Sequence, residues 1–534
     1  MALGRRRIPH NVLMPDPTAE LPWWRRAVFY QIYPRSFCDS DGDGVGDLAG
    51  IESHLDHLVW LGVDAIWLSP FFRSPMADFG YDVADYCDVD PLFGSLADFD
   101  RLLAACHDHG LRMIIDWVPN HTSNEHPWFG ESRASKDSAK RDWYVWRNGT
   151  RDEPPNNWRA QFPDGPAWTW DESTSQWYLH LFTPEQPDLD WDNPAVEAAM
   201  HDTLRFWLDR GVDGFRMDVV HLIGKDPALP DLPLGQERST VVTNDEPVTH
   251  ERLRRLRSLL DGYPGARTSV GEVYLLGPGQ IAPYYGEHGD ELHMAFNFAA
   301  LWSPWDAAAW EANLAAARRS LDPVDAWPTW VLSNHDVPRH RTRYGSEARA
   351  RAAAVLLLTL RGTPFVYAGE ELGLEDAVVP PDREVDPGGR DGCRAPIPWD
   401  DTTAHGWRTA DNWLPWPPDA DERSVARQRD DPHSTLALYR RVLSLRRLLG
   451  ALTEGELVPV DAPVGVLAYE RRLGDERVLV AVNFSSESQT IAADGAWSVA
   501  IDSADAGVEG LPFDGQLAAD HAVIAVVAIG AYGG

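Results

Sequence analysis

Short apolar runs that end in polar residues recur along this chain, and helical stretches separate them. Four of these runs end in carboxylates or histidines, at residues 116–121, 214–218, 271–274 and 333–336. In a fold that alternates strands and helices, the carboxyl ends of successive strands converge on one face, where polar groups lie in a crevice rather than in a core. We therefore expect the four segments to form one active site.

Eight strand–helix units can be counted, with one or two weak members, and this period predicts a (β/α)8 barrel of the α/β class. Strands are predicted at 28–33, 65–68, 111–115, 212–217, 268–270, 329–332 and 364–367. Helices are predicted at 51–61, 95–109, 194–210, 306–320, 347–361 and 434–449.

Other parts of the chain depart from this alternation. Residues 117–190, after the third strand, are rich in Trp, Pro, Asn and Gly and predict an inserted subdomain. After residue 450, short runs of alternating apolar residues predict an all-β sandwich. The predicted domains are therefore a barrel of residues 1–116 and 191–450, an inserted subdomain of residues 117–190 and a C-terminal β-sandwich of residues 451–534.

The formal net charge of −34 makes nucleic acid and anionic membranes poor partners, because like charges repel. The four cysteines lie far apart without a C-x-x-C pair, so neither a zinc ribbon nor a disulfide scaffold is indicated. The sequence contains no apolar segment of the kind that directs secretion or spans a bilayer. We expect a cytoplasmic protein that acts on a neutral small molecule without an organic cofactor.

The spacing of Arg216 and Asp218 places both side chains on one face of a strand, toward the barrel mouth. A guanidinium beside a carboxylate lowers the pKa of that carboxylate and keeps it ionised, as a nucleophile requires. A purely structural Arg–Asp pair explains the same two residues equally well.

Glu272 supplies a second carboxyl at another strand end. Two carboxyls in different surroundings form the nucleophile and the acid of a retaining glycosidase. The alternative role is an acidic residue that stabilises the N-terminus of a helix.

His335 and Asp336 add a hydrogen-bond donor and a third carboxylate, which together match two neighbouring hydroxyls of a sugar. A metal site is not indicated here, because no further His or Cys follows at ligand spacing. His121, beside Asn120, is another candidate donor, although a lone loop histidine more often has a structural role.

The acidic run at residues 39–47 follows the ligand spacing of an EF-hand loop. Its candidate ligands are Asp39, Asp41, Asp43, Asp47 and the main-chain carbonyl of Val45. The twelfth position is Gly50 instead of the bidentate Glu, so we expect a structural Ca²⁺ or Mg²⁺ site and not a sensor. A metal-free acidic turn is the alternative.

The four motifs in this order resemble those of the α-amylase family, glycoside hydrolase family 13, and within it the α-glucosidase and oligo-1,6-glucosidase branch. The similarity spans nearly the whole chain and includes Asp-Phe-Gly-Tyr-Asp at 78–82, Gln-Pro-Asp-Leu-Asp-Trp at 186–191 and Gly-Arg-Asp-Gly-Cys-Arg at 389–394.

This resemblance implies that Asp218 is the nucleophile, Glu272 the general acid/base and Asp336 the carboxylate that binds and helps to distort the reacting glucose. It implies that the remaining substrate-binding residues are Asp78, Tyr81, His121, Phe162, Phe182, Gln186, Arg216, Val219, His335, Arg390 and Arg394. Asp78 and Arg394 would close the pocket behind the non-reducing end, which makes cleavage exo-acting. The 39–47 loop matches the family's metal loop.

The implied activity is that of a retaining exo-acting α-glucosidase on short oligosaccharides such as maltose, isomaltose or sucrose, with transglucosylation as a side activity. Val219 is typical of relatives that cleave α-1,6 bonds. However, Val220, His221 and Asp190 differ from the residues expected in oligo-1,6-glucosidases, and the loop at 224–246 would alter the site beyond the cleaved bond. The linkage therefore stays open.

The nearest alternatives are an oligo-1,6-glucosidase proper and a glucosyl-transferring relative, such as a sucrose isomerase or trehalose synthase, which shares the catalytic residues. A non-catalytic relative is disfavoured, because Asp218, Glu272 and Asp336 are all retained. We expect a monomer or a homodimer.

Overall fold

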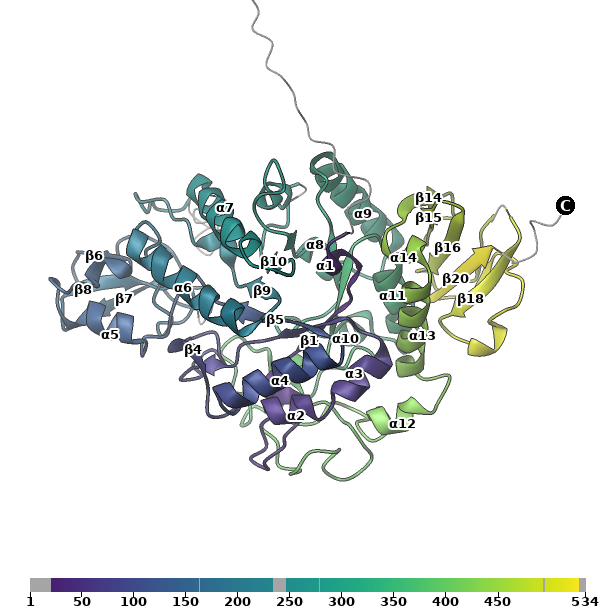
Figure 1. The fold of residues 1–534 in the computed structure, drawn as a ribbon, viewed down its shortest axis with the longest axis horizontal. Coiled ribbons are helices and arrows are strands. Elements are labelled where there is room, and N and C mark those ends of the chain that lie inside the picture. Colours follow the sequence, from purple (N-terminus) through teal and green to yellow (C-terminus); the bar gives the residue numbers. More distant parts are fainter. Residues whose placement is uncertain (1–20, 163, 234–245, 278, 493–494, 528–534) are drawn as a thin grey trace, which may run out of the picture.

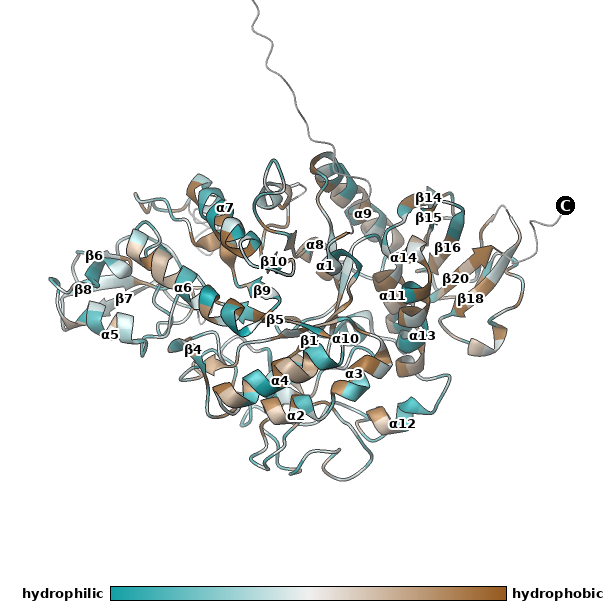
Figure 2. Cartoon of the chain, viewed as in Figure 1, coloured by the Kyte–Doolittle hydropathy of each residue, from teal (hydrophilic) through white to brown (hydrophobic). Residues whose placement is uncertain are grey.

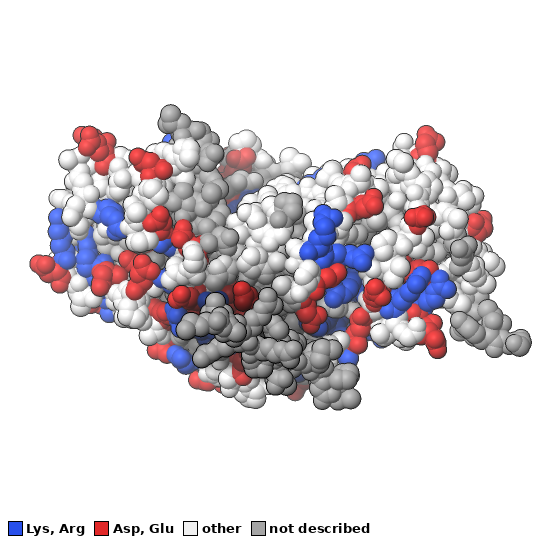
Figure 3. All heavy atoms as spheres, turned by 90° about the horizontal axis from the view of Figure 1, so that it is seen from above, with Lys and Arg blue, Asp and Glu red and all other residues white. Residues whose placement is uncertain are grey.

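The computed structural model describes residues 21–162, 164–233, 246–277, 279–492 and 495–527. Within these ranges a barrel lies at the centre, a small subdomain lies on one side of it and a β domain lies at the opposite end (Figure 1). Acidic and basic side chains are interspersed on the face seen in Figure 3. Among the described residues, none of the helices combines the length and the hydropathy needed to cross a bilayer.

Eight parallel strands form the barrel: β1 (Phe29–Ile32), β2 (Ala65–Leu68), β5 (Arg112–Trp117), β9 (Gly214–Met217), β10 (Thr268–Gly271), β11 (Met294–Ala295), β12 (Thr329–Val331) and β13 (Thr363–Tyr367). They pair in this order from β1 to β11, and β13 pairs with both β1 and β12. The Thr329 hydroxyl donates to the Ala295 carbonyl at 2.8 Å and so links β12 to β11. The predicted (β/α)8 barrel is confirmed.

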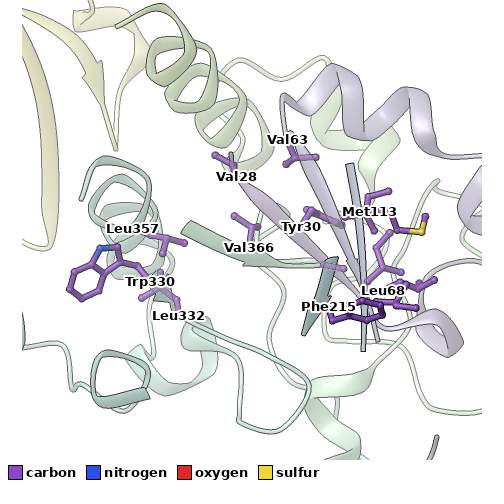
Figure 4. Close-up of a cluster of buried hydrophobic side chains, with 14 of the residues drawn as sticks. Val28, Tyr30, Val63, Leu68, Met113, Phe215, Trp330, Leu332, Leu357 and Val366 are labelled. Carbon is purple, nitrogen blue, oxygen red and sulfur yellow. The ribbon is translucent and has the colours of Figure 1, made fainter. Parts of the chain in front are cut away.

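The barrel strands are buried along almost their whole length, as strands covered by helices on one side and by a packed interior on the other must be. Figure 4 shows part of this core, with Tyr30, Met113 and Phe215 from strands and Leu357 from a covering helix. Polar groups therefore gather where the strands end. β11 was not predicted, because a strand of two residues gives no periodic signal.

Six longer helices cover the barrel: α4 (Leu96–Asp108), α6 (Pro194–Arg210), α7 (Pro247–Asp261), α9 (Ala307–Leu321), α11 (Glu347–Thr359) and α13 (Thr435–Leu448). α4 carries both hydrophobic and hydrophilic residues in Figure 2, as a helix with one buried face should. Five of the six begin at a residue whose side chain accepts a main-chain N–H of the first turn, namely Ser95, Asn193, Asp306, Ser346 and Ser434.

The prediction of one continuous helix at 51–61 is wrong. The segment forms two helices, α2 (Leu48–Glu52) and α3 (Leu55–Leu61), with a break at Ser53 and His54. The Ser53 hydroxyl donates to the Gly50 carbonyl at 2.8 Å, and the His54 ring lies 2.9 Å from the same carbonyl. These side chains compete for a main-chain acceptor that a continuous helix would use.

The inserted subdomain contains α5 (Pro127–Ala134) and a three-stranded sheet of β6 (Trp146–Arg147), β8 (Gln176–Leu179) and β7 (Trp168–Asp171), in that order. Phe129 of α5 packs on the rings of Tyr144, Trp146 and Tyr178. The described part of the 224–246 loop also packs here, since Asn157 exchanges hydrogen bonds of 2.8 Å with the main chain of Leu232. Residues 234–245 of that loop lie outside the described residues.

The C-terminal domain has an antiparallel sheet with the order β14 (Glu456–Val460), β15 (Val466–Leu473), β16 (Glu476–Asn483), β20 (His521–Val527) and β18 (Trp497–Asp502). A second sheet pairs β17 (Gln489–Thr490) with β19 (Gln516–Leu517). Ile491 and Leu517 pack against one face of the larger sheet. This arrangement agrees with the predicted C-terminal β-sandwich.

Two buried arginines tie this domain to the barrel. Arg471 of β15 donates to the carbonyls of Thr359, Leu452 and Gly455 at 2.6–3.3 Å. Arg446 of α13 donates to Leu452 and to two carbonyls near the end of α11. Both side chains thus satisfy main-chain acceptors that water does not reach.

We expect Arg471→Met to destabilise the protein by about 2–4 kcal/mol, because several buried carbonyls lose their donor. Arg472→Met is the matched control, because the Arg472 side chain is half-exposed and its partner Glu470 keeps a second arginine, Arg477. Thermal or urea unfolding of both variants measures the difference. Equal stability of the two variants would contradict this role of Arg471.

Candidate active site

The four polar strand ends meet around one guanidinium. Arg216, on β9, is buried, and its Nη1 donates to Asp116 and, at 2.6 Å, to Asp218. Its Nη2 donates to Glu272, at the end of β10. The structure therefore brings together Arg216, Asp218 and Glu272, and adds Asp116 from the end of β5.

Burial raises the pKa of the Asp218 carboxyl well above its ordinary value, and the nearby carboxylates of Glu272 and Asp116 act in the same direction. Arg216 opposes this rise but does not cancel it. Burial likewise raises the pKa of Asp116 to about 6. Arg216 lowers the pKa of Asp218, as predicted, but burial outweighs its effect, so the net shift is upward.

His335 lies at the next polar strand end, after β12, and has partners on both ring nitrogens. Gln31 Nε2 lies 2.8 Å from Nδ1, and the Tyr81 hydroxyl lies 2.6 Å from Nε2. The Tyr81 and His335 rings are stacked with centroids 5.4 Å apart. Burial lowers the pKa of His335 to about 3, so its ring is neutral at physiological pH.

Asp336 faces two arginines, and the three residues form one wall of the site. Arg390 Nη1 lies 2.9 Å from its carboxylate, and Arg394 Nη2 lies 3.4 Å away. Burial raises the pKa of Asp336, but the facing positive charges, including those of Arg390 and Arg394, lower it by more, so the net pKa is below its ordinary value. Asp336 is therefore a permanent anion in the site.

Asp78 forms another part of the site. Its carboxylate accepts from Arg390 Nη2 at 2.6 Å and from Gln186 Nε2 at 3.0 Å, and Gln186 also contacts His121 at 3.1 Å. The predicted partner Arg394 is instead held by the His335 carbonyl and by Asp386. In the structure Arg390, rather than the predicted Arg394, contacts Asp78, although the charge of Arg394 also lowers the pKa of Asp78 against the effect of burial.

These side chains enclose a cavity of about 320 Å³. Its lining residues are Asp78, Tyr81, His121, Gln161, Phe162, Phe182, Asp218, Val219, Glu272, Asp336, Gly388 and Arg390. Phe162 and Phe182 come from the inserted subdomain, with ring centroids 5.8 Å apart. Gln161 and Gly388 were not predicted, because they lie in irregular segments without a pattern.

Two other polar residues of the site were also missed. Gln31 is a polar side chain inside the otherwise apolar run 28–33, and that interruption is the signal that points to it. Lys225, in the 224–246 loop, lies 3.0–3.1 Å from Asn120, the Leu222 carbonyl and Asp188. The Lys225 ammonium therefore contacts three parts of the chain: the barrel, the connection after β9 and the inserted subdomain. Only the folded structure shows these contacts, because the three parts are far apart in the sequence.

Val219, directly after Asp218, has an unusual backbone conformation. Its φ and ψ are 33° and 40°, a left-handed conformation that is costly for a β-branched residue. Its N–H lies 3.3 Å from the Glu272 carboxylate, and its side chain lines the cavity. The same side chain packs in a cluster with Trp158, Leu222 and Leu229, so it connects the cavity to the inserted subdomain.

The acidic loop after β1 brings the carboxylates of Asp39, Asp41 and Asp43 within 4.8 Å of one another. This set of hard oxygen donors fits Ca²⁺ or Mg²⁺. Val45 donates its N–H to Asp43 at 2.8 Å. Asp47 lies outside the carboxylate group, since its oxygens accept from Ser40 and from the Gly50 N–H, where it caps α2.

Comparisons with known proteins show which family the chain is similar to. The family described as α-amylase, catalytic domain, matches residues 31–455. A probable α-glucosidase of Rhizobium meliloti (strain 1021) is 44% identical over 512 residues, which cover 90% of this chain and 92% of the relative. An oligo-1,6-glucosidase of Parageobacillus thermoglucosidasius is 37% identical over 522 residues, covering 88% and 92%.

Solved structures are similar over the same extent. The structure of an α-glucosyl transfer enzyme matches with a TM-score of 0.86 and 42% identity, covering 95% of this chain and 100% of that one. A trehalulose synthase from Pseudomonas mesoacidophila MX-45 matches with a TM-score of 0.88 and 35% identity, covering 96% and 100%.

Proposed function

The chain belongs to the α-amylase family, and we propose that it is a retaining, exo-acting α-glucosidase that removes terminal glucose from short α-linked oligosaccharides. One observation carries the proposal: a single buried guanidinium holds Asp218 and Glu272 together in the lining of one cavity. The carboxyls of retaining glycosidases lie about 5–5.5 Å apart, and two carboxyls bound to neighbouring nitrogens of one guanidinium are compatible with that separation.

In the proposed reaction, Asp218 attacks the anomeric carbon while Glu272 protonates the departing oxygen. The two carboxyls of a retaining glycosidase have different roles, and we assign the nucleophile to Asp218 and the acid/base to Glu272. Water activated by Glu272 then releases α-glucose from the covalent intermediate. A sugar hydroxyl in place of water would give transglucosylation.

The pair of Asp78 and Arg390 supports exo-action. They contact each other at 2.6 Å and both line the cavity, and we assign them to the end that holds the non-reducing sugar, so that only one sugar unit fits on that side of the cleaved bond. We assign the hydroxyls of that sugar to Asp78, Arg390, His121 and Asp336, and its apolar face to the Tyr81 ring. The neutral His335 orients Tyr81 through their 2.6 Å contact.

We expect Asp218→Asn to lower turnover by more than about a thousandfold, because the amide keeps the shape of the side chain but cannot attack the anomeric carbon. Asp325→Asn, at an exposed carboxylate that faces Arg25 and does not line the cavity, is the control. Glucose release and circular dichroism check activity and folding together. A folded Asp218→Asn protein with substantial turnover would remove Asp218 from this role.

The linkage preference is tested by glucose release from maltose and isomaltose at equal concentration. We expect faster cleavage of isomaltose, because Val219 lines the cavity beside the acid. Val219→Thr keeps the β-branched shape and should shift the ratio toward maltose. Faster cleavage of maltose by the unchanged protein would mean that His221 and the 224–246 loop override Val219.

A glucosyl-transferring or isomerising activity is the second candidate. It is favoured by the likeness to an α-glucosyl transfer enzyme and to a trehalulose synthase, which cover nearly the whole chain. Product analysis on sucrose separates the two: free glucose and fructose support hydrolysis, whereas a new disaccharide supports isomerisation. Absence of glucose from all three substrates, with new disaccharides formed, would favour isomerisation, because transfer to another acceptor still releases glucose from maltose and isomaltose.

We also propose a structural Ca²⁺ or Mg²⁺ held by Asp39, Asp41 and Asp43, in a protein of the reducing cytoplasm, where its four unpaired cysteines would remain thiols. We expect removal of the ion with EDTA to lower the melting temperature more than it lowers activity, because the loop lies apart from the cavity-lining residues. Readdition of Ca²⁺ should restore the melting temperature. Unchanged melting of protein shown to be metal-free by elemental analysis would count against the site.

A further inference from the structure

One polar side chain interrupts the apolar interior of the barrel at its first strand. Gln31 lies on β1 and is 1% exposed. Because side chains alternate along a strand, Gln31 shares the interior face with Phe29, whereas Tyr30 and Ile32 pack toward the helices. A buried amide is costly unless it is hydrogen-bonded, so the partners of Gln31 indicate what it does.

The amide nitrogen of Gln31 faces His335, which follows β12. Gln31 Nε2 lies 2.8 Å from His335 Nδ1 and 3.1 Å from the Ser69 hydroxyl. Within the described residues, Gln31 Oε1 has no hydrogen-bond partner. The polar contacts of this side chain are therefore those of its nitrogen.

The His335 ring is fixed in its plane. Two phenol rings stack on it, that of Tyr81 with centroids 5.4 Å apart and that of Tyr33 with centroids 5.7 Å apart. Arg394 Nε donates to the His335 main-chain carbonyl at 2.8 Å. Because the ring is neutral and held in place, the property that remains to be determined is which of its two nitrogens carries the proton.

The surroundings of Nε2 determine the position of this proton. His335 Nε2 lies 3.3 Å from the Asp336 carboxylate and 2.6 Å from the Tyr81 hydroxyl. An ionised carboxylate can only accept a hydrogen bond, so the proton belongs on Nε2. Nδ1 is then an acceptor that needs a donor, and the Gln31 amide is the donor that faces it.

We propose that Gln31 is a positioning residue of the active site, which donates to Nδ1 and so keeps the His335 proton on Nε2, where Asp336 and Tyr81 accept it. The inference rests on the proposed glucosidase function, in which Asp336 and Tyr81 contact the reacting sugar. Both of these side chains line the cavity, and neither Gln31 nor His335 is among its lining residues. Gln31 therefore acts through His335 and not on the substrate.

The same proton position determines what the Tyr81 hydroxyl can do. This hydroxyl accepts from His335 Nε2 and from Arg216 Nη1, which lie 2.6 Å and 3.3 Å away. With both acceptor positions taken, its own proton is free for a further acceptor in the cavity that Tyr81 lines. If the His335 proton were on Nδ1, Tyr81 would instead donate to Nε2 and would have no proton for the sugar.

Two substitutions separate the hydrogen bond from the shape of the side chain. Gln31→Met has a similar length but no donor, so kcat/KM on p-nitrophenyl α-glucoside should fall about tenfold or more at every pH tested. Gln31→Glu can serve as a donor only while the introduced carboxyl and the ring share a proton. Its kcat/KM should exceed that of Gln31→Met by about tenfold near pH 5 and fall toward the same level as the pH rises.

Each rate is compared with that of the unaltered protein at the same pH. Gln516→Glu makes the same substitution at an exposed position on β19 and should change no rate. Melting curves establish that each variant is folded. The charged groups nearest to the ring do not explain a pH-dependent difference, because arginines stay protonated and Asp336 stays ionised. These groups are Asp336, Arg394, Arg216 and Arg390.

A measurement on the unaltered protein without substrate shows the proton position directly. Nuclear magnetic resonance of protein labelled with ¹⁵N-histidine distinguishes a protonated ring nitrogen from a bare one. The chain has 18 histidines, so the signals of His335 are identified by their loss in His335→Gln. We expect a protonated Nε2 and a bare Nδ1 from about pH 5 to about pH 8.

Three outcomes would overturn the proposal. A protonated Nδ1 with a bare Nε2 would mean that Gln31 accepts from His335 and does not donate to it. Full activity of Gln31→Met would mean that His335 needs no donor. Equal losses in Gln31→Met and Gln31→Glu at every pH would mean that Gln31 only fills space. An unaltered protein that does not cleave p-nitrophenyl α-glucoside would instead overturn the proposed function and the catalytic role of Gln31 with it, while the proton position would still decide whether Gln31 donates to His335.

Discussion

The active site depends on one buried positive charge. Arg216 donates to Asp116, Asp218 and Glu272, which come from three different strand ends. Three carboxyls in a dry cavity would repel one another and remain protonated without it, and the guanidinium alone would be costly to bury. Contacts with this one guanidinium therefore hold the three carboxyls close together, although the residues are far apart in the chain.

The same principle recurs along the wall of the cavity. Arg390 binds Asp78, Asp336 and Asp386, and Arg394 binds Asp386, Asp336 and the His335 carbonyl. Such networks stabilise a fold only when every charge finds a partner, so a change in one member disturbs the others. We infer that this part of the site is rigid, because no side chain can move without exposing an unpaired charge to a site with little water.

Much of this arrangement could be predicted from local patterns. The spacing of two between Arg216 and Asp218 indicated a shared strand face, and the polar ends of the apolar runs indicated convergence. The sequence could not show whether Arg390 or Arg394 contacts Asp78, because both arginines belong to the same motif. Only the folded loop shows that Arg390 makes this contact. Nor could the sequence give the pKa of Asp218, which depends on how many carboxyls share Arg216 and on how little water surrounds them.

The two ends of the cavity are built on different physical principles. The end assigned to the non-reducing sugar recognises hydroxyls through charged groups whose positions depend on one another, so it tolerates little change. The entrance is formed by the strained Val219, the inserted subdomain and side chains whose contacts are mainly apolar. Because apolar contacts are less directional than charged hydrogen bonds, residues there can be exchanged without unpairing a charge. Relatives with this fold can therefore keep the glucose-binding end and differ in linkage, leaving group and acceptor.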